Sequence, residues 1–289
     1  MDNKTYNVKL KAIKTNPEIT CQLNAVKGKR VVSSLSKKSI VADLESIVFT
    51  EKKHALENFY GGPSKIGSTS FKKIPDKIRT APGITNLNRS FCGARNVTEI
   101  DLSQFETPNV VDMSLMFADC GKVKSLDLFY LDTSKVTNME DMFASCYALV
   151  PDFSNFDTHN VENMQSMFSG SFQGTGYIDL DLTSFNVSKV TDMREMFSQC
   201  RKLRSVDLTG WDTSKVQDFG SMFYSCEKLT EIKGVIDMAS ATSYKNMFDY
   251  YVAQALTKKV KIMNMPNNFF SDSNNARAKS KIEVLSYRG

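Results

Sequence analysis

The sequence has few of the residues on which most catalytic sites depend. Its 289 residues include two histidines and one tryptophan, and it shows no glycine-rich phosphate loop, zinc-ligand spacing or nucleophile elbow. Catalysis requires a nucleophile, a base or metal ligands in distinct roles. His159 falls in a repeated loop, and His54 lies beside Lys52 and Lys53. The sequence therefore predicts a non-enzymatic protein with no metal site and no cofactor.

Long hydrophobic runs are also missing. No stretch approaches the roughly 18 apolar residues that a membrane-spanning helix needs. Residues 1–7 lack the apolar core and small-residue cleavage site of a signal peptide. We therefore expect no membrane insertion and no export by the general secretory route.

Charge is distributed unevenly along the chain. Residues 1–80 contain sixteen Lys or Arg against seven Asp or Glu, a net charge of +9, so residues 81–289 carry −4 of the total of +5. The positive charge of this segment could attract nucleic acid or an acidic protein surface. Because its charges are scattered, with few aromatic residues between them, a solvated surface is the preferred interpretation, and nucleic acid is not an expected partner.

A repeat occupies the chain from about residue 84 to about residue 250. Its signature is a Met-Phe pair with Met three residues before it and Val six before it, as in Val136, Met139, Met142 and Phe143. Four units match fully, and the units ending at residues 91, 223 and 248 match in part. Successive phenylalanines are 25 to 29 residues apart. Self-similarity at such a period indicates stacked repeats.

Each unit is predicted to hold one helix and one strand. The apolar spacing within the tetrad is typical of one helical face, and Thr137 with Glu140 offers a capping box. An alternating stretch such as 203–208 predicts a strand. The expected fold is an α/β repeat solenoid, a leucine-rich-repeat horseshoe of about seven strand-loop-helix coils. Strands should line its concave side, because helices need about 10 Å of spacing and strands about 4.8 Å.

The Met-rich stripe is predicted to be the core, since methionine adapts well to buried gaps. The predicted core residues are Met116, Phe117, Met142, Phe143, Met167, Phe168, Met196, Phe197, Met222 and Phe223. Four cysteines occur three residues after a phenylalanine, and Ser171 and Tyr251 occupy the same position in other units. Bridged pairs would be broken by such replacements, so we expect buried free thiols rather than disulfides or zinc ligands.

The string from Asp132 to Phe143, followed by Cys146 and Leu149, resembles the BspA-type leucine-rich repeats. That family includes mycoplasma surface lipoproteins and bacterial adhesins, with relatives in phages. The resemblance covers roughly residues 71–250 and implies a repeat array used for attachment or protein recognition. It implies no catalytic residues.

The flanking segments differ from the repeat. Residues 1–70 are predicted to be a basic segment with strands near 8–12, 23–26, 31–32 and 47–49 and a helix over 51–60. This segment either caps the solenoid, spanning 71–250, or attaches it to another protein. Residues 251–289 are predicted to form a C-terminal cap with strands near 260–263 and 282–285.

The candidate binding site is the outward side of the strands. The acidic residues predicted there are Glu99, Asp101, Asp127, Asp179, Asp181, Asp207 and Glu231. Stacked like charges are unfavourable, so a basic partner or a cation is one interpretation. The preferred one is that each Asp bonds the backbone of its own loop. Phe105, Phe129 and Trp211 begin the neighbouring loops and could anchor a partner, although their repeat position predicts that they are core.

The sequence thus predicts an attachment or protein-interaction module. The favoured setting is a phage virion, as a receptor-binding or structural component of a tail or capsid decoration. The alternatives are a bacterial cell-surface adhesin and an intracellular scaffold. The expected partner is a protein or host-surface molecule bound by the repeat face, with residues 1–80 docking the chain to a virion or an oligomer. The expected location is a virion, or otherwise the cytoplasm or the cell surface.

Overall fold

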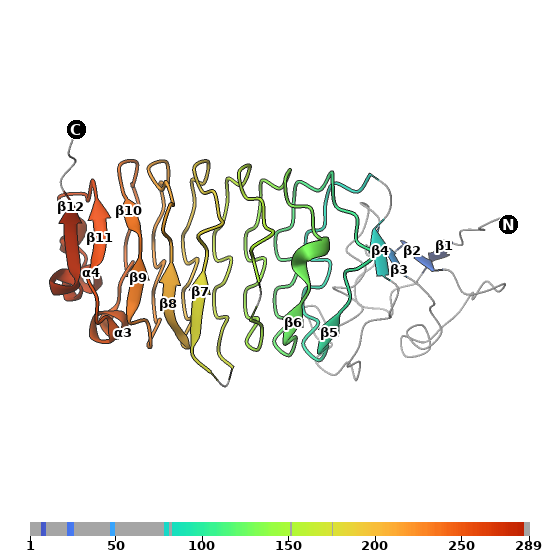
Figure 1. Cartoon of the computed structure of the whole chain (residues 1–289), viewed down its shortest axis with the longest axis horizontal. Coiled ribbons are helices and arrows are strands. Elements are labelled where there is room, and N and C mark those ends of the chain that lie inside the picture. Colours follow the sequence, from blue (N-terminus) through green and yellow to red (C-terminus); the bar gives the residue numbers. More distant parts are fainter. Residues whose placement is uncertain are drawn as a thin grey trace.

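The computed structural model describes residues 83–150, 152–174 and 176–285, preceded by short strands at 7–9, 22–25, 47–49 and 78–80. The described chain makes successive circuits, here called coils and named by their repeated phenylalanine, which stack along one straight axis (Figure 1). One column of parallel bridges joins seven coils through the residue five positions before each phenylalanine. The bridged residues are Asn86, Asp112, Asn138, Asn163, Asp192, Asp218 and Ser243.

The strands of the coils are short and parallel. They are β5 (Glu99–Ile100), β6 (Ser125–Leu126), β7 (Ile178–Asp181), β8 (Leu203–Asp207), β9 (Glu231–Lys233), β10 (Val235–Asp237), β11 (Val260–Met263) and β12 (Ile282–Leu285). They form three small sheets of orders β5-β6, β7-β8-β9 and β10-β11-β12. Gly234 separates β9 from β10 with a φ of +94°, where an added Cβ would lie 2.6 Å from the Leu208 carbonyl oxygen.

A fourth sheet precedes the repeat. It contains β1 (Asn7–Lys9), β2 (Gln22–Ala25), β3 (Ile47–Phe49) and β4 (Ile78–Thr80), in that order. β1, β2 and β3 pair antiparallel, whereas β3 and β4 pair parallel. Three of these strands lie where the sequence predicts β structure. The helix expected over 51–60 and the strand expected at 31–32 lie outside the described residues.

Few residues of the described chain are helical. The helices are η1 (Leu128–Tyr130), α3 (Tyr250–Ala255), η2 (Phe269–Ser271), α4 (Ser273–Arg277) and η3 (Lys279–Lys281). The segment that carries the Met-Phe signature is not among them, since residues 140–145 are turns. The predicted leucine-rich-repeat horseshoe of strand-loop-helix coils is therefore wrong. The described fold consists mostly of small parallel sheets linked by turns.

Backbone geometry explains why the signature segment is not a helix. In the Phe143 coil, Asp141 and Ser145 have φ values of +53° and +58°, and most other coils have left-handed residues at the same two positions. An α-helix needs right-handed φ throughout, and left-handed non-glycine residues cost about 1–2 kcal/mol each. The expected cap is also absent, because the Asn138 side chain, rather than Thr137, accepts from a backbone N–H, that of Glu140 at 3.1 Å.

Hydrogen bonds between coils offset this strain. The N–H groups of Met139, Asp141, Phe143 and Ser145 donate to carbonyls of the next coil over 2.8–3.0 Å. Within the coil, the Met142 N–H donates to the Met139 carbonyl at 3.2 Å, which closes a turn. In a helix all of these N–H groups would bond four residues back in the same segment. Stacking therefore supplies partners that an isolated segment would lack.

The apolar residues of the signature fill the interior of the stack. The ten predicted core residues, namely Met116, Phe117, Met142, Phe143, Met167, Phe168, Met196, Phe197, Met222 and Phe223, are each at most 1% exposed. Seven phenylalanine rings form one stack with centroids 5.3–6.0 Å apart. Parallel strands on the other side repeat at about 4.8 Å. Because the two sides have similar spacing, the coils stack straight and do not bend into a horseshoe.

The repeated cysteines are free and buried. The Cys146 thiol donates to the Phe117 carbonyl of the preceding coil at 3.1 Å, and Cys120, Cys200 and Cys226 make the same contact at 2.9–3.3 Å. Ser171 replaces the thiol with a hydroxyl that bonds the Phe143 carbonyl. Burial raises the pKa of these four thiols well above its ordinary value. They are structural groups and poor nucleophiles.

A buried threonine column ties β4 to the coils. The Thr133 hydroxyl donates to the Asp157 carbonyl and accepts from the Asp157 N–H, both at 2.9 Å. Thr80 of β4 makes the same pair of bonds to Glu106, at 2.8 and 2.9 Å. The regular stacking therefore begins before the first recognisable repeat unit, at β4.

The helix α4 closes the turn side of the stack at its C-terminal end. The buried Asn275 side chain accepts from the Phe248 N–H at 3.1 Å and donates to the Tyr244 carbonyl at 2.9 Å. Asp272 accepts from the N–H groups of Asn274 and Asn275 at 3.1 and 3.0 Å and so caps the helix. Side chains thus replace the backbone partners that a further coil would provide.

Candidate binding face

The strand face is the side of the stack formed by β5 to β9 and the loops that follow them. Its outward residues form two columns and not the single acidic column expected. One column places Asp179, Ser205 and Glu231 in register, with Glu99 and Ser125 in register farther along. The other contains Asp181, Asp207 and Lys233 in register, together with Asp101 and Asp127 directly after β5 and β6. The face therefore carries mixed charge.

The second column is made of loop-forming aspartates. The side chains of Asp101, Asp127, Asp181 and Asp207 each accept the N–H of the residue two positions later, at 2.9–3.1 Å. Such bonds define Asx turns. The backbone bond from Thr183 lowers the pKa of Asp181. The pKa of Asp207 is lowered by the side chain of Thr209 and, to a smaller extent, by the backbone bond from the same residue. These carboxylates organise the loops that follow their strands, which is the interpretation preferred from the sequence.

Sequence reasoning missed one member of this column. Asp152 accepts the Ser154 N–H at 2.9 Å in the same way, and this bond lowers its pKa. The signal was present as Asp, an apolar residue and then Ser or Thr, the pattern that also begins at Asp101, Asp181 and Asp207. Asp152 lies nine residues after Phe143, whereas Asp101 and Asp207 lie ten residues after their phenylalanines, so alignment by the phenylalanine misses it.

Cations already neutralise two of the predicted acids. Asp179 accepts from Arg204 Nε at 2.9 Å and forms a second bond to the same guanidinium. These bonds, together with one from the Ser205 hydroxyl, lower the pKa of Asp179 to about 2. Lys233 Nζ lies 3.2 Å from Oδ2 of Asp207 and forms an ion pair with it. These carboxylates therefore do not need an external cation or basic partner to offset their charge.

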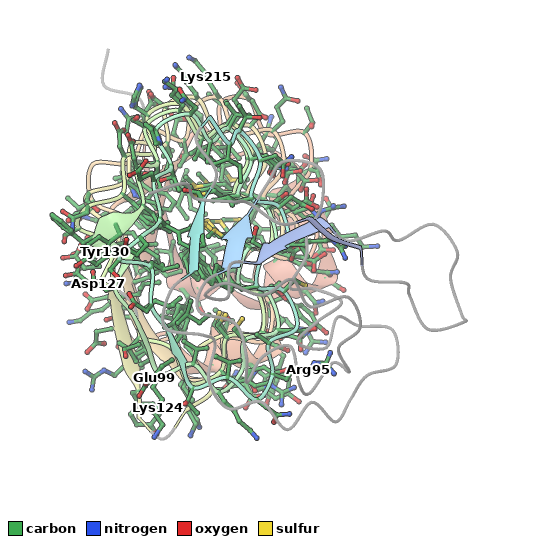
Figure 2. The ribbon with its side chains drawn as sticks, turned by 90° about the vertical axis from the view of Figure 1, so that its right-hand side faces the viewer. Arg95, Glu99, Lys124, Asp127, Tyr130 and Lys215 are labelled. Carbon is green, nitrogen blue, oxygen red and sulfur yellow. The ribbon has the colours of Figure 1, made fainter. Side chains whose placement is uncertain are left out.

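The strand face also exposes a pair of aromatic side chains. Phe129 is 69% exposed and Tyr130 is 41% exposed in η1, with their ring centroids 5.8 Å apart. The helix η1 projects from the stack beside β6 (Figure 1), and Tyr130 lies on the same side of the cross-section as Glu99 and Asp127 (Figure 2). Exposed aromatic residues on a fixed backbone are suited to anchoring a partner.

The expectation that Phe129 is a core residue is wrong. Phe105 and Trp211 are 4% and 7% exposed, as their repeat position predicts. In the coil of Phe117 that position is filled by Leu131, at 2% exposure. Asp127 accepts the Phe129 N–H and starts a 3-10 turn, which carries Phe129 and Tyr130 outward. The repeat register accounts for the exposure, because Phe129 is the twelfth residue after Phe117, the position of Ser103 and Thr209 in their coils, whereas the core position is the fourteenth.

The opposite side, the turn face, contains the residues from the repeated Val to the repeated Cys. Asp141 lies there, and burial, followed by repulsion from Glu140 and Glu195, raises its pKa from 3.8 to about 6. Since the folded protein holds this proton more tightly than the unfolded chain, the associated stability is complete below about pH 4. It is lost as the pH rises through 6.

Replacing Asp141 by Asn should therefore stabilise the protein at pH 7.5 by about 1 kcal/mol, after allowing for partial exposure. Asn keeps the shape and tolerates the left-handed φ of this position. Urea unfolding at pH 7.5 and at pH 4 measures the difference, which should nearly vanish at pH 4. An equal difference at both pH values would show that the charge is not its cause.

His159 takes part in a loop contact. Its Nδ1 lies 2.6 Å from the Asp157 carboxylate, and its Nε2 lies 2.8 Å from the Asn160 amide. Among the residues that the structure describes, no group of three His, Cys, Asp or Glu side chains is placed to hold a metal ion. Within the same residues, no helix is both long and apolar enough to cross a membrane.

Comparison with known proteins places the repeat in a family. Residues 68–173 and 170–263 both match the family described as "Mycoplasma protein of unknown function, DUF285". Neither the comparison with curated proteins nor that with solved structures gave a match. The two matched segments together span more than half of the sequence and coincide with the stacked coils. The chain therefore belongs to the DUF285 family, a family associated with BspA-like repeat proteins.

Proposed function

We propose that this chain is a non-catalytic attachment module of the BspA-like kind, which binds a protein on a host or particle surface through its strand face. The observation that carries the proposal is the exposed pair Phe129 and Tyr130. Association removes such rings from water, and aromatic anchors contribute a large share of binding energy.

The fold supports this function by holding the anchors rigidly. Asp127 fixes η1 through its bond to the Phe129 N–H at 3.1 Å, and Leu131 is buried directly after the exposed pair. Little conformational entropy is therefore lost when a partner covers the two rings. The surrounding Asx turns and ion pairs provide a polar rim, as is usual around an apolar interface centre.

The test is direct binding of the labelled full-length chain to intact bacteria, to cultured host cells and to virions. The double variant Phe129→Ser and Tyr130→Ser should bind at least about thirtyfold more weakly to the target recognised by the wild type, the loss of about 2 kcal/mol expected for an anchor. The control is Val111→Ser with Tyr224→Ser, which removes exposed side chains of the turn face.

The outcomes distinguish a virion component, a cell-surface adhesin and an intracellular scaffold. Binding to virions, with or without binding to bacteria, supports the predicted virion component, whereas binding to cells alone supports an adhesin. Equal binding by both double variants would place the interface elsewhere than on the strand face. The absence of binding to all three targets would overturn attachment and favour the scaffold.

A further inference from the structure

Cations are concentrated along one edge of an otherwise acidic stack. Residues 84–250 contain fourteen Lys or Arg against twenty-three Asp or Glu. Seven of the fourteen cations lie in one short part of the repeat, from the fourth to the seventh residue after a repeated phenylalanine. The same positions contain one acid, Glu227. We call this edge the basic corner. Its cations are Arg95, Lys122, Lys124, Arg201, Lys202, Arg204 and Lys228.

The basic corner has two parts, one in the coils of Phe91 and Phe117 and one in the coils of Phe197 and Phe223, because the coils of Phe143 and Phe168 between them have no cation at these positions. In the cross-section, Lys124 lies at the lower left beside Glu99 and Arg95 at the lower right, both at the end opposite Lys215 (Figure 2). Farther along, the Thr230 N–H donates to the Arg204 carbonyl at 2.8 Å, and the Lys258 N–H lies 3.3 Å from the Thr230 carbonyl. Lys258 and its neighbour Lys259 therefore extend the corner into the C-terminal region.

Six lysines of this edge make no ion pair with any described residue. They are Lys122, Lys124, Lys202, Lys228, Lys258 and Lys259, whereas Arg95, Arg201 and Arg204 pair with Asp119, Glu227 and Asp179. Lys202 and Lys228 occupy equivalent positions in adjacent coils. Like charges stacked in this way repel each other. A bound anion would offset that repulsion.

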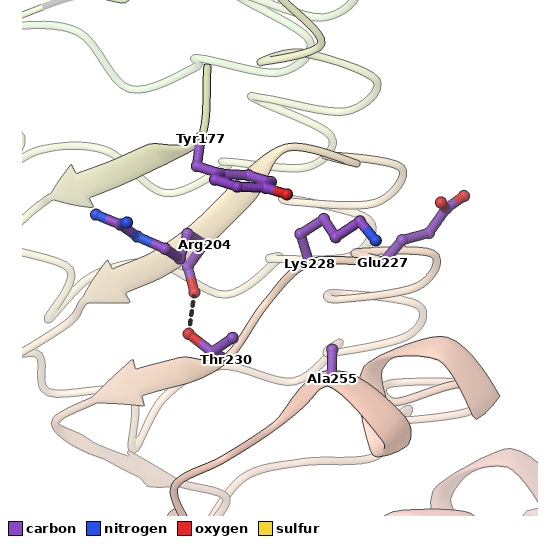
Figure 3. A pocket seen from close by; sticks show the side chains of 6 residues that line it. All are labelled: Tyr177, Arg204, Glu227, Lys228, Thr230 and Ala255. Carbon is purple, nitrogen blue, oxygen red and sulfur yellow. Dashed lines mark hydrogen bonds between the residues drawn. The ribbon is translucent and has the colours of Figure 1, made fainter. Parts of the chain in front are cut away.

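A surface depression lies within the same edge. Its volume is about 350 Å³, and it is lined by Tyr177, Arg204, Glu227, Lys228, Thr230 and Ala255. Tyr177 stands on one side and Thr230 and Ala255 on the other, with Arg204 and Lys228 between them (Figure 3). The Tyr177 side chain is 56% exposed, and Lys202 Nζ lies 5.6 Å from the centre of its ring. The three-residue-longer coil of Phe168 brings Tyr177 to this place.

We infer that the basic corner binds an acidic polysaccharide and that the Tyr177 depression holds one of its sugars. Lys202 and Lys228 would bind carboxylate or sulfate groups through charge-assisted hydrogen bonds. The Tyr177 ring offers an apolar surface to the C–H face of a sugar. Glu227 is an acceptor for hydroxyl groups, and Thr230 can both donate and accept.

The same residues favour a glycan over a nucleic acid. Single-stranded nucleic acids are held by several aromatic rings on which successive bases stack, but the depression contains one ring. The inferred site is separate from Phe129 and Tyr130, so it adds a second binding surface beyond the proposed function.

The experiment measures binding of the full-length chain to immobilised heparin, used as a generic sulfated polysaccharide, over a range of salt concentrations. Reversing two charges by Lys202→Glu with Lys228→Glu should weaken binding about tenfold or more at low salt. The matched control, Lys135→Glu with Lys215→Glu, makes the same charge change on exposed lysines outside the corner and should weaken binding less than about twofold. Tyr177→Ala should weaken binding without any change of charge.

Three results would overturn the inference. The first is wild-type affinity in the Lys202→Glu and Lys228→Glu variant. The second is an equal loss in the Lys135→Glu and Lys215→Glu control, which would indicate attraction by net charge alone. The third is tighter binding of single-stranded DNA than of heparin with the same sensitivity to both variants, which would identify a nucleic-acid site. Unchanged thermal unfolding of each variant shows that the fold is intact, and unchanged target binding through Phe129 and Tyr130 keeps this test separate from that of the proposed function.

Discussion

Replacing Phe143 by Ala should lower the free energy of unfolding by about 4 kcal/mol, near the middle of the range for buried aromatic residues. Phe143 is 1% exposed and stacks between Phe117 and Phe168, with ring centroids 5.5 and 6.0 Å away. Its edge also meets Phe153 at 5.4 Å. Alanine would leave a cavity in the middle of the ring stack, where the stacked coils have little freedom to collapse around it.

Urea unfolding followed by the fluorescence of Trp211, the single tryptophan of the chain, measures this effect from two coils away. Phe129→Ala is the matched control, because the same ring is removed from a 69% exposed position and should cost less than about 0.5 kcal/mol. A loss below about 1.5 kcal/mol for Phe143→Ala would mean that the stack tolerates a cavity and that the ring column is not its main source of stability. An unchanged Trp211 transition with a lost far-ultraviolet signal would show that the coils unfold independently.

Replacing Asn275 by Leu should cost about 3 kcal/mol. Leucine has a similar size but cannot bond the Phe248 N–H or the Tyr244 carbonyl, which Asn275 contacts at 3.1 and 2.9 Å. Each buried polar group left without a partner costs about 1–3 kcal/mol. The last coil would then expose unpaired backbone groups toward an apolar side chain.

The neighbouring substitution Asn274→Leu serves as control, because Asn274 is half-buried and makes one side-chain bond, to Asn246 at 2.9 Å. It should cost less than about 1 kcal/mol. Thermal unfolding and amide hydrogen exchange of Phe248 measure both variants. If Asn275→Leu left the exchange rate of the Phe248 N–H unchanged, α4 would not be the element that closes the turn side.

The repeat period could be predicted from the sequence, whereas the backbone conformation within each unit could not. The period of 25 to 29 residues is visible in the sequence because each coil must place the same side chains in the same interior. The helix was wrong because the spacing of Met139, Met142 and Phe143 fits two conformations. In one, an isolated segment bonds to itself. In the other, it turns at Asp141 and Ser145 and donates to the next coil. Only contacts between residues about 26 apart select the second.

In the candidate site too, local features could be predicted from the sequence and contacts between coils could not. Asp101, Asp181 and Asp207 could be assigned to Asx turns from their local sequence, since such a turn bonds a carboxylate to a backbone group two residues away. The ion pair of Asp179 with Arg204 joins adjacent coils and follows from neither composition nor period. The exposure of Phe129 does follow from the period, because Phe129 lies two residues before the core position that Leu131 fills.

By itself, the sequence determined that residues of the repeat are arranged in successive equivalent units, that the Met-Phe stripe is apolar enough to be buried, and that the cysteines recur at one position. These follow from the order of residue types along the chain, in which the same pattern recurs every 25 to 29 residues. The tertiary structure decided that the units are turn-and-strand coils stacked straight, that Lys202 and Lys228 of adjacent coils share one edge, and that Phe129 and Tyr130 lie in a 3-10 turn. The reason is that the deciding hydrogen bonds and charges lie between coils, and a single unit in isolation has no partner for them.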